Sequence, residues 1–168
     1  MKARLPRMYL WNQPQEAALL RLFAAIIDVA SITTGQLEDL IARMIRVMKK
    51  ADGIGLAAPQ IGQSIRLAVL DRRVTPNRQP LVLYNPVVTH SSQEQTSEEE
   101  GCLSIPGVFG LVPRARSIVV NNLDASGRLA TIEADGLFAR VIQHEIDHLN
   151  GKLFIDRATM ITQGKDRL

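Results

Sequence analysis

Two histidines four residues apart are the first feature of this sequence that could do chemistry. They lie in VIQHEIDHLNG, residues 141–151, in the pattern His-Glu-x-x-His. On a helix, His144 and His148 project from the same face and can converge on one metal ion. Glu145 follows the first histidine, where its carboxylate can reach a water held by that ion. The alternative is a surface helix that carries two histidines by chance, because the pattern is short.

A metal site needs a third protein ligand, and the sequence excludes one common choice. Phe154 stands where a histidine would continue the motif as His-x-x-Gly-x-x-His. His90 lies in a strand-like stretch without a second motif, and we expect it to be an ordinary core or surface residue. Cys102, the only cysteine, lies in EEEGCLSIPG. Its thiolate would complete a Cys-His-His set with one open position, although lone cysteines are usually small buried apolar residues. Asp147 and Gln143 are either polar helix positions or groups that orient the histidines.

A glycine-rich stretch, GIGLAAPQ at residues 53–60, matches a permitted form of the dinucleotide-binding fingerprint. We reject that function because the fingerprint follows a strand and opens a helix. Here a helix precedes the stretch, and Pro59 stands where the next helix should be growing. Two interpretations remain: a helix end with a tight loop, or a backbone edge that a substrate approaches closely, with Gln60 donating from its amide.

The helices that must position these residues are predicted from apolar residues at three- and four-residue spacing. One helix is predicted from Leu37, with a capping box over residues 33–36 at its start. The helix that carries the histidines is predicted over about 137–149. Asp135 would cap it and Gly151 would end it.

Strands fill the region between the two helices. They are predicted at residues 65–71, 81–88, 117–121 and 129–133. The turn-forming residues 124–127 join the last two as a hairpin, and the acidic residues 92–100 are predicted to be a solvated loop. This order predicts an α+β fold: a single catalytic domain, 1–168, with antiparallel strands around a central helix that bears the histidines, and an N-terminal helix. Residues 1–35 give the least readable pattern.

Composition restricts the compartment and the partners. Of the 168 residues, 46% are hydrophobic and 22% charged, as in soluble globular proteins. One cysteine excludes an intrachain disulfide, which suits a reducing compartment. The apolar residues 17–30 are too few to span a bilayer, so no membrane partner is expected. The net charge of +3, without interleaved aromatic and basic residues, predicts no direct specific nucleic-acid binding. We expect a cytoplasmic protein, or alternatively an organelle-matrix protein, given the basic residues Lys2, Arg4 and Arg7.

Three segments together resemble the signature motifs of the peptide deformylase family, in the family's order. They are GIGLAAPQ (53–60), EGCLS (100–104) and QHEIDH (143–148), and the resemblance covers about residues 37–156. It implies a metal-dependent hydrolase that removes the formyl group from N-terminal formylmethionine of newly made polypeptides and releases formate. The implied partners are those nascent N-formylmethionyl chains.

The resemblance also implies roles for individual residues. The implied metal ligands are Cys102, His144 and His148. The implied catalytic groups are Glu145, as general base and acid, and Gln60 with the backbone N–H of Leu103, facing the oxyanion. The implied substrate-binding residues are Ile54, Gly55, Gly101, Leu137, Arg140 and Val141. One divalent ion would be bound; the resemblance favours Fe²⁺, and the ligand types also suit Zn²⁺, Ni²⁺ or Co²⁺.

Three features depart from the family pattern. Residues 1–35 lack its usual opening segment, and Phe109 stands near a position where some bacterial members have a substrate-binding arginine. Residues 157–168 are too few for the long C-terminal helix with which some members dock on the ribosome, so ribosome binding is unsupported.

Two other classes of function stay open. In a cysteine hydrolase, Cys102 would be the nucleophile and a histidine its base. A non-catalytic member of the family would bind chain N-termini or use a metal for structure alone. A metal bound in stoichiometric amount and required for turnover would exclude both.

Overall fold

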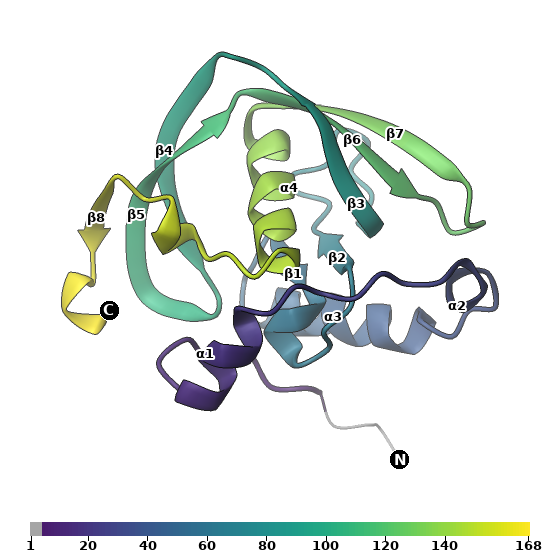
Figure 1. The fold of residues 1–168 in the computed structure, drawn as a ribbon, viewed down its shortest axis with the longest axis horizontal. Coiled ribbons are helices and arrows are strands. Elements are labelled where there is room, and N and C mark those ends of the chain that lie inside the picture. Colours follow the sequence, from purple (N-terminus) through teal and green to yellow (C-terminus); the bar gives the residue numbers. More distant parts are fainter. Residues whose placement is uncertain (1–4) are drawn as a thin grey trace.

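The computed structural model describes residues 5–168, so Lys2 and Arg4 lie outside the described residues. Two antiparallel sheets flank helix α4 (Gly136–Leu149), which lies between them (Figure 1). This confirms the predicted α+β fold with strands around the histidine-bearing helix. The first sheet has the order β1 (Gly55–Ala57), β2 (Leu67–Leu70), β3 (Leu81–Ser91), β6 (Ser117–Leu123), β7 (Leu129–Asp135). The second has the order β4 (Gln95–Cys102), β5 (Ile105–Ala115), β8 (Met160–Gln163).

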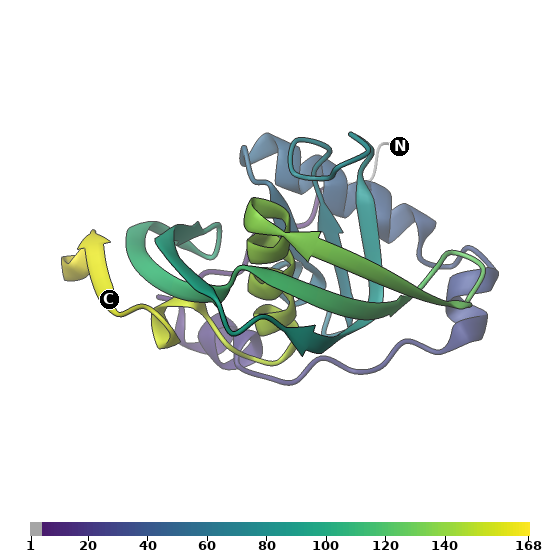
Figure 2. The ribbon, with the colours of Figure 1, turned by 90° about the horizontal axis from the view of Figure 1, so that it is seen from above.

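Two long hairpins extend from α4 in different directions. In both Figure 1 and Figure 2, the β4–β5 hairpin lies on one side of α4 and the β6–β7 hairpin extends from the other. The register of β4 with β5 runs from Gln95 opposite Ala115 to Gly101 opposite Phe109. The end of β4 is thereby brought beside the helix, because β5 packs against α4.

Strand β2 shows why helices cover both faces of the first sheet. Successive side chains of a strand point to opposite faces. Leu67 and Val69 pack in the cluster that includes α3 (Glu38–Lys50), while Ala68 and Leu70 pack in the cluster that includes α4. All four side chains are fully buried. The continuous apolar run Leu-Ala-Val-Leu therefore fits a strand held between two helices.

The acidic residues 92–100 are not a loop, contrary to our expectation, because most of them form β4. Glu98 and Glu99 are exposed and keep their charges in solvent, whereas Glu100 is buried. Strand β4 is an edge strand of its sheet, and charged side chains are common on such edges because they discourage further pairing. Charge density alone does not distinguish that situation from a loop.

Residues 5–35 contain two short helices, α1 (Pro14–Leu20) and α2 (Val29–Thr33), joined by an extended segment. The expected capping box is wrong, because Leu37 is the N-cap of α3 and makes no side-chain bond. In the extended segment, the Ala24 N–H donates to Leu149 O, at the end of α4. Short 3-10 helices complete the fold, at Ala58–Ile61 (η1), Phe154–Asp156 (η2) and Lys165–Arg167 (η3). None of the helices within residues 5–168 is both long and apolar enough to traverse a bilayer.

Candidate metal centre and substrate cleft

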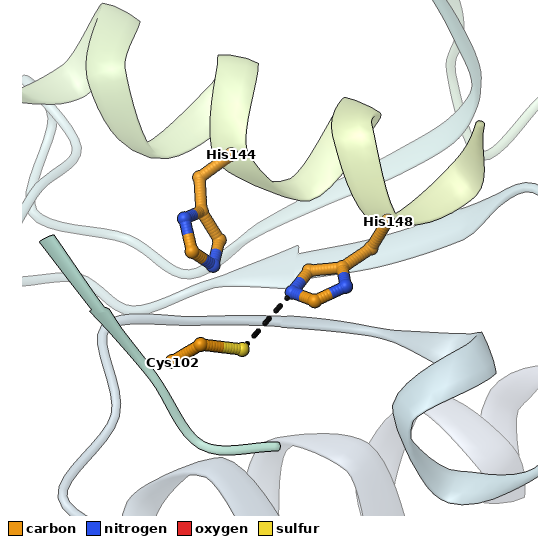
Figure 3. Close-up of side chains that lie close together, drawn as sticks. All are labelled: Cys102, His144 and His148. Carbon is orange, nitrogen blue, oxygen red and sulfur yellow. Dashed lines mark hydrogen bonds between the residues drawn. The ribbon is translucent and has the colours of Figure 1, made fainter. Parts of the chain in front are cut away.

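The three candidate metal ligands converge from two elements. Cys102 is the last residue of β4, and His144 and His148 lie one turn apart on α4. One donor atom from each lies within 4.8 Å of the others, and Cys102 Sγ is 3.3 Å from His148 Nε2. Figure 3 shows the cysteine facing the two imidazoles that descend from the helix. The spacing of four residues places both imidazoles on one side of the helix, as expected, and the end of β4 supplies the third group.

Glu100 orients His144, a contact that sequence reasoning missed. His144 Nδ1 is 3.0 Å from Glu100 Oε2, and Arg114 holds both carboxylate oxygens at 2.8 Å. Burial alone would raise the pKa of Glu100, but the bonds from Arg114 and His144 hold that pKa well below its usual range. The carboxylate therefore accepts from the Nδ1–H, which leaves Nε2 of His144 free to bind a metal ion.

The two helix residues considered as orienting groups make other contacts. Gln143 bonds the backbone of Ala115, and Asp147 accepts from Arg114 and Arg157. None of these hydrogen bonds involves a histidine. The signal that could have pointed to Glu100 is its place two residues before the cysteine, on the opposite side of the pleat from exposed Glu99.

The residues present fit a divalent transition metal. His148 is 1% exposed, and burial lowers its pKa well below the usual value, so the imidazole is neutral and has a lone pair to give. One thiolate and two imidazoles form a donor set that suits zinc and iron among other ions, and three protein ligands leave one position for water or substrate.

Glu145 lies directly beneath strand β1. A Cβ added at Gly55 would be 2.2 Å from Glu145 Oε1, so only glycine permits the backbone to pass this close. The glutamate is 3% exposed, and burial raises the pKa of its carboxyl group to about 7. Its Oε2 has no hydrogen-bond partner within residues 5–168. A carboxylate in this position is placed to exchange a proton with a molecule in the adjacent cleft.

The cleft has a volume of about 780 Å³ and lies where two free sheet edges face each other. Strand β1 is the edge of the first sheet, and β4 is the edge of the second. Residues from both edges and from α4 line it. They include Gln60, Cys102, Leu103, His144 and Glu145, with the six expected substrate-binding residues Ile54, Gly55, Gly101, Leu137, Arg140 and Val141.

The lining residues differ in what they offer. Gln60 accepts from Ala57 N–H (2.9 Å) and donates to Ser104 Oγ (3.2 Å), which fixes its amide beside the cysteine.

The walls of the cleft differ in exposure: Leu137 is half exposed at the rim, whereas Val141 is buried. The Arg140 guanidinium is occupied by Glu100 and by the carbonyls of Thr96 and Val112. Arg140 therefore contributes a wall and no free charge. Phe109 also lines the cleft and covers Gly101, a contact that local sequence did not reveal.

A Cys-His-His ligand set beside a buried glutamate, opening on a cleft between strand edges, defines a metal-dependent hydrolase. The family model described as Polypeptide deformylase matches residues 12–164. The chain therefore belongs to the polypeptide deformylase family, hydrolases that remove the N-formyl group from newly made polypeptides.

Relatives and solved structures agree with this assignment. Over 122 residues the chain is 48% identical to peptide deformylase of Treponema pallidum (strain Nichols), covering 73% of each sequence. It is 41% identical over 133 residues to that of Desulforudis audaxviator, covering 79% of this chain and 84% of the relative. It spans 61% of a peptide deformylase of Prochlorococcus marinus, with 52% identity over 123 residues and 73% of this chain covered.

The structure of the Thermotoga maritima peptide deformylase superposes with a TM-score of 0.83 and 37% identity, over 94% of this chain and 99% of that chain. The Acinetobacter baumannii class I type b peptide deformylase, bound to Met-Ala-Ser, superposes with a TM-score of 0.83 and 33% identity, over 94% and 99% of the two chains.

Proposed function

We propose that this chain deformylates N-formylmethionyl polypeptides with Cys102, His144 and His148 as ligands of one divalent metal and Glu145 as general base and acid. The observation that carries the proposal is the convergence of three donor atoms within 4.8 Å of one another, beside a 3% exposed glutamate. The metal proposed is Fe²⁺, and Zn²⁺, Ni²⁺ or Co²⁺ would suit the same donors. When bound, such an ion supplies Lewis-acid chemistry, which polarises the formyl oxygen and lowers the pKa of water.

The protein groups then act on the formyl carbon in turn. Glu145 accepts the proton of the attacking water and later delivers a proton to the leaving amine. The Gln60 amide and the Leu103 N–H donate to the oxygen on which negative charge develops. Gln60 is supported in this role because its amide is held by Ala57 and Ser104 before substrate arrives, so little reorganisation is needed. The products are formate and a chain with a free α-amino group.

The substrate would enter as an extended strand between β1 and β4. The backbone of Ile54, Gly55 and Gly101 lies along these two edges, and main-chain hydrogen bonds there are indifferent to substrate sequence. Leu137, Arg140 and Val141 would form the wall against the methionine side chain. The close approach of the Gly55 backbone to Glu145 favours a formyl group over larger acyl groups. These substrates are made on ribosomes, so we place the protein in the cytoplasm, or alternatively in an organelle matrix.

Replacing Glu145 tests the proposal. Glu145→Gln keeps the size of the side chain and removes its ability to exchange a proton, so kcat for formate release from formyl-Met-Ala-Ser should fall by about 10²–10⁴. Metal content should stay at one ion per chain. Glu133→Gln, on the exposed face of β7, is the matched control and should keep full activity. Full activity in metal-loaded Glu145→Gln would refute the assigned role.

Metal dependence separates this mechanism from a cysteine nucleophile. The assay is run anaerobically on protein reconstituted separately with Fe²⁺, Zn²⁺ or Ni²⁺, with the bound metal quantified. Turnover should vanish on chelation and return only with metal. Turnover by protein stripped of metal would instead support Cys102 as nucleophile, and metal-loaded protein without turnover would support the non-catalytic alternative.

A further inference from the structure

A second cavity, of about 500 Å³, lies against another face of α4. Its lining residues from α4 and from the helix end are Gln143, Ile146, Asp147 and Asn150. The substrate cleft is lined by a different set of α4 residues, Leu137, Arg140, Val141, His144 and Glu145. The rest of its lining comes from β3, from Ser92 and Gln95 after it, from the end of β5, and from Arg66 and Arg157. The two cavities share no lining residue, so the second one is not an extension of the substrate cleft.

Arg66 is the distinctive group of this cavity. Its Nη1 donates to Asn150 Oδ1 (2.9 Å) and Leu149 O (3.4 Å), and its Nη2 donates to Pro86 O (2.9 Å). These acceptors, all within residues 5–168, are neutral and use three of the five guanidinium N–H groups. Two donors remain for a ligand. Burial also lowers the pKa of this guanidinium from its usual value, which records the cost of a charge that lacks a carboxylate partner.

The other charged side chains of the lining, Arg114, Arg157 and Asp147, pair with one another and with Glu100, which lies outside it. Asp147 accepts from Arg114 at 2.6 Å and from Arg157 at 2.6 and 2.8 Å. Arg114 is also paired with Glu100. The one carboxylate in the lining is thus neutralised by two arginines and offers little repulsion to an anion. Within residues 5–168, Arg66 is the charged side chain of the lining that pairs with no carboxylate.

The remainder of the lining is mixed. It includes the polar side chains of Ser91, Ser92, Gln95 and Gln143 beside the apolar side chains of Val87, Pro113 and Ile146. A ligand suited to the cavity is therefore small, carries one negative charge and tolerates polar and apolar surroundings. We propose that this cavity is a binding site for small monocarboxylic acids, with the carboxylate on Arg66.

Benzoate and benzamide form a matched pair of probes for this site. They are added to the Zn²⁺-loaded protein, and backbone amide shifts are followed by NMR at Ser92 and Ala115 in the cavity and at Gly101 in the substrate cleft. Benzoate should shift the cavity amides in a saturable way, and benzamide should bind at least about 10-fold more weakly, because it lacks the charge that strengthens the bond to Arg66.

Arg66→Gln should weaken benzoate binding at the cavity by about 10-fold or more, while formate release from formyl-Met-Ala-Ser stays unchanged. Arg128→Gln, an exposed arginine on the β6–β7 turn, should leave benzoate binding unchanged. Benzoate shifts confined to Gly101, equal binding of benzamide, or no saturable shift at Ser92 and Ala115 would each overturn the proposal. If Arg66→Gln does not fold, the comparison of benzoate with benzamide on the unaltered protein still decides it.

Discussion

At Gly55 the backbone of β1 lies against the carboxylate of Glu145. Adding one methyl group at this residue therefore tests whether the position of that carboxylate matters for catalysis. Gly55→Ala places a Cβ 2.2 Å from Glu145 Oε1 and 3.0 Å from Val141 Cγ1, so the carboxylate must move. Because misplacing a reacting group by about 1 Å can cost about 10²-fold, we expect kcat to fall by roughly 10–10². Steady-state kinetics with formyl-Met-Ala-Ser measure this.

Metal content and thermal unfolding are the controls for Gly55→Ala. The proposed metal ligands lie on other elements, so metal content and Tm should both remain close to those of the unaltered protein. Unchanged kcat in the Gly55→Ala variant would mean that the position of Glu145 in the structure is not the one used in catalysis.

Arg114 is the central group of the buried charges near the metal site. It is 4% exposed and bonds both Glu100 and Asp147. Arg114→Ala leaves two buried carboxylates without their shared partner, so the free energy of unfolding should fall by about 3–5 kcal/mol. Arg116→Ala, two residues further on and half exposed, should cost about 0–1 kcal/mol. Urea unfolding of both variants gives the comparison, and equal losses would contradict a special role for Arg114.

At the scale of single residues, the spacing in the sequence predicted those contacts that helix geometry alone determines. Two histidines one turn apart must share a face, whatever the rest of the chain does. Cys102 could be reached by excluding other ligands. The pairing of Glu100 with Arg114 depends on the register of β4 against β5, and no periodicity in the sequence encodes that register.

Among the elements, an ion pair joins the N-terminal segment to the residues after α4. Arg21 donates to Asp156, and Asp156 also accepts from Leu153 N–H at 2.8 Å. Burial tends to raise the pKa of Asp156, but these bonds lower it below the usual 3.8. A depressed pKa means that the folded state is stabilised above pH 3.8, and that this contribution is lost as pH falls through the lower folded value.

Asp156→Asn should therefore reduce the free energy of unfolding by about 1 kcal/mol at pH 7, a modest loss because the pair is partly exposed. The difference from the unaltered protein should be constant from pH 7 to 5 and shrink below about pH 4, as measured by urea unfolding. Asp166→Asn, at the exposed C-terminal end, is the control and should show no such difference. A loss that persisted undiminished in acid would show that Asp156 acts through packing instead of charge.

Elements with a long apolar pattern were predictable, and short ones were not. The helix over Glu38–Lys50 and the helix over Gly136–Leu149 bury one side against strands, so the three- and four-residue spacing is visible. Helices α1 and α2 have seven and five residues, which is too short for a period to emerge. Strand β4 was mistaken for a loop because its edge position lets it carry charge.

For the whole molecule, the proposed metal would add a link between the second sheet and helix α4. Cys102 belongs to the second sheet, and both histidines belong to the helix packed against the first. A ligand that binds only the folded state stabilises it by about 2.7 kcal/mol at 100 times its dissociation constant. Removing the metal by chelation should therefore lower Tm, and adding it back should restore Tm.

Hydrogen exchange locates that effect. On chelation, amides of β4 near Cys102 should lose more protection than amides of the β6–β7 hairpin, which lies on the other side of α4 (Figure 2). The Cys102→Ser variant serves as the comparison, because its Tm should respond less to chelation. Equal loss of protection in both hairpins would mean that the metal does not act at the end of β4.

The edges of β1 and β4 line one cleft, and no strand of residues 5–168 fills it. A polypeptide that enters there is recognised by its main chain, and the proposed reaction at Glu145 needs its N-terminal end. The same geometry would make deformylation depend on timing during protein synthesis, because a chain end already folded into its own domain cannot enter the cleft. Chains that bury their first residues early would then keep the formyl group longest.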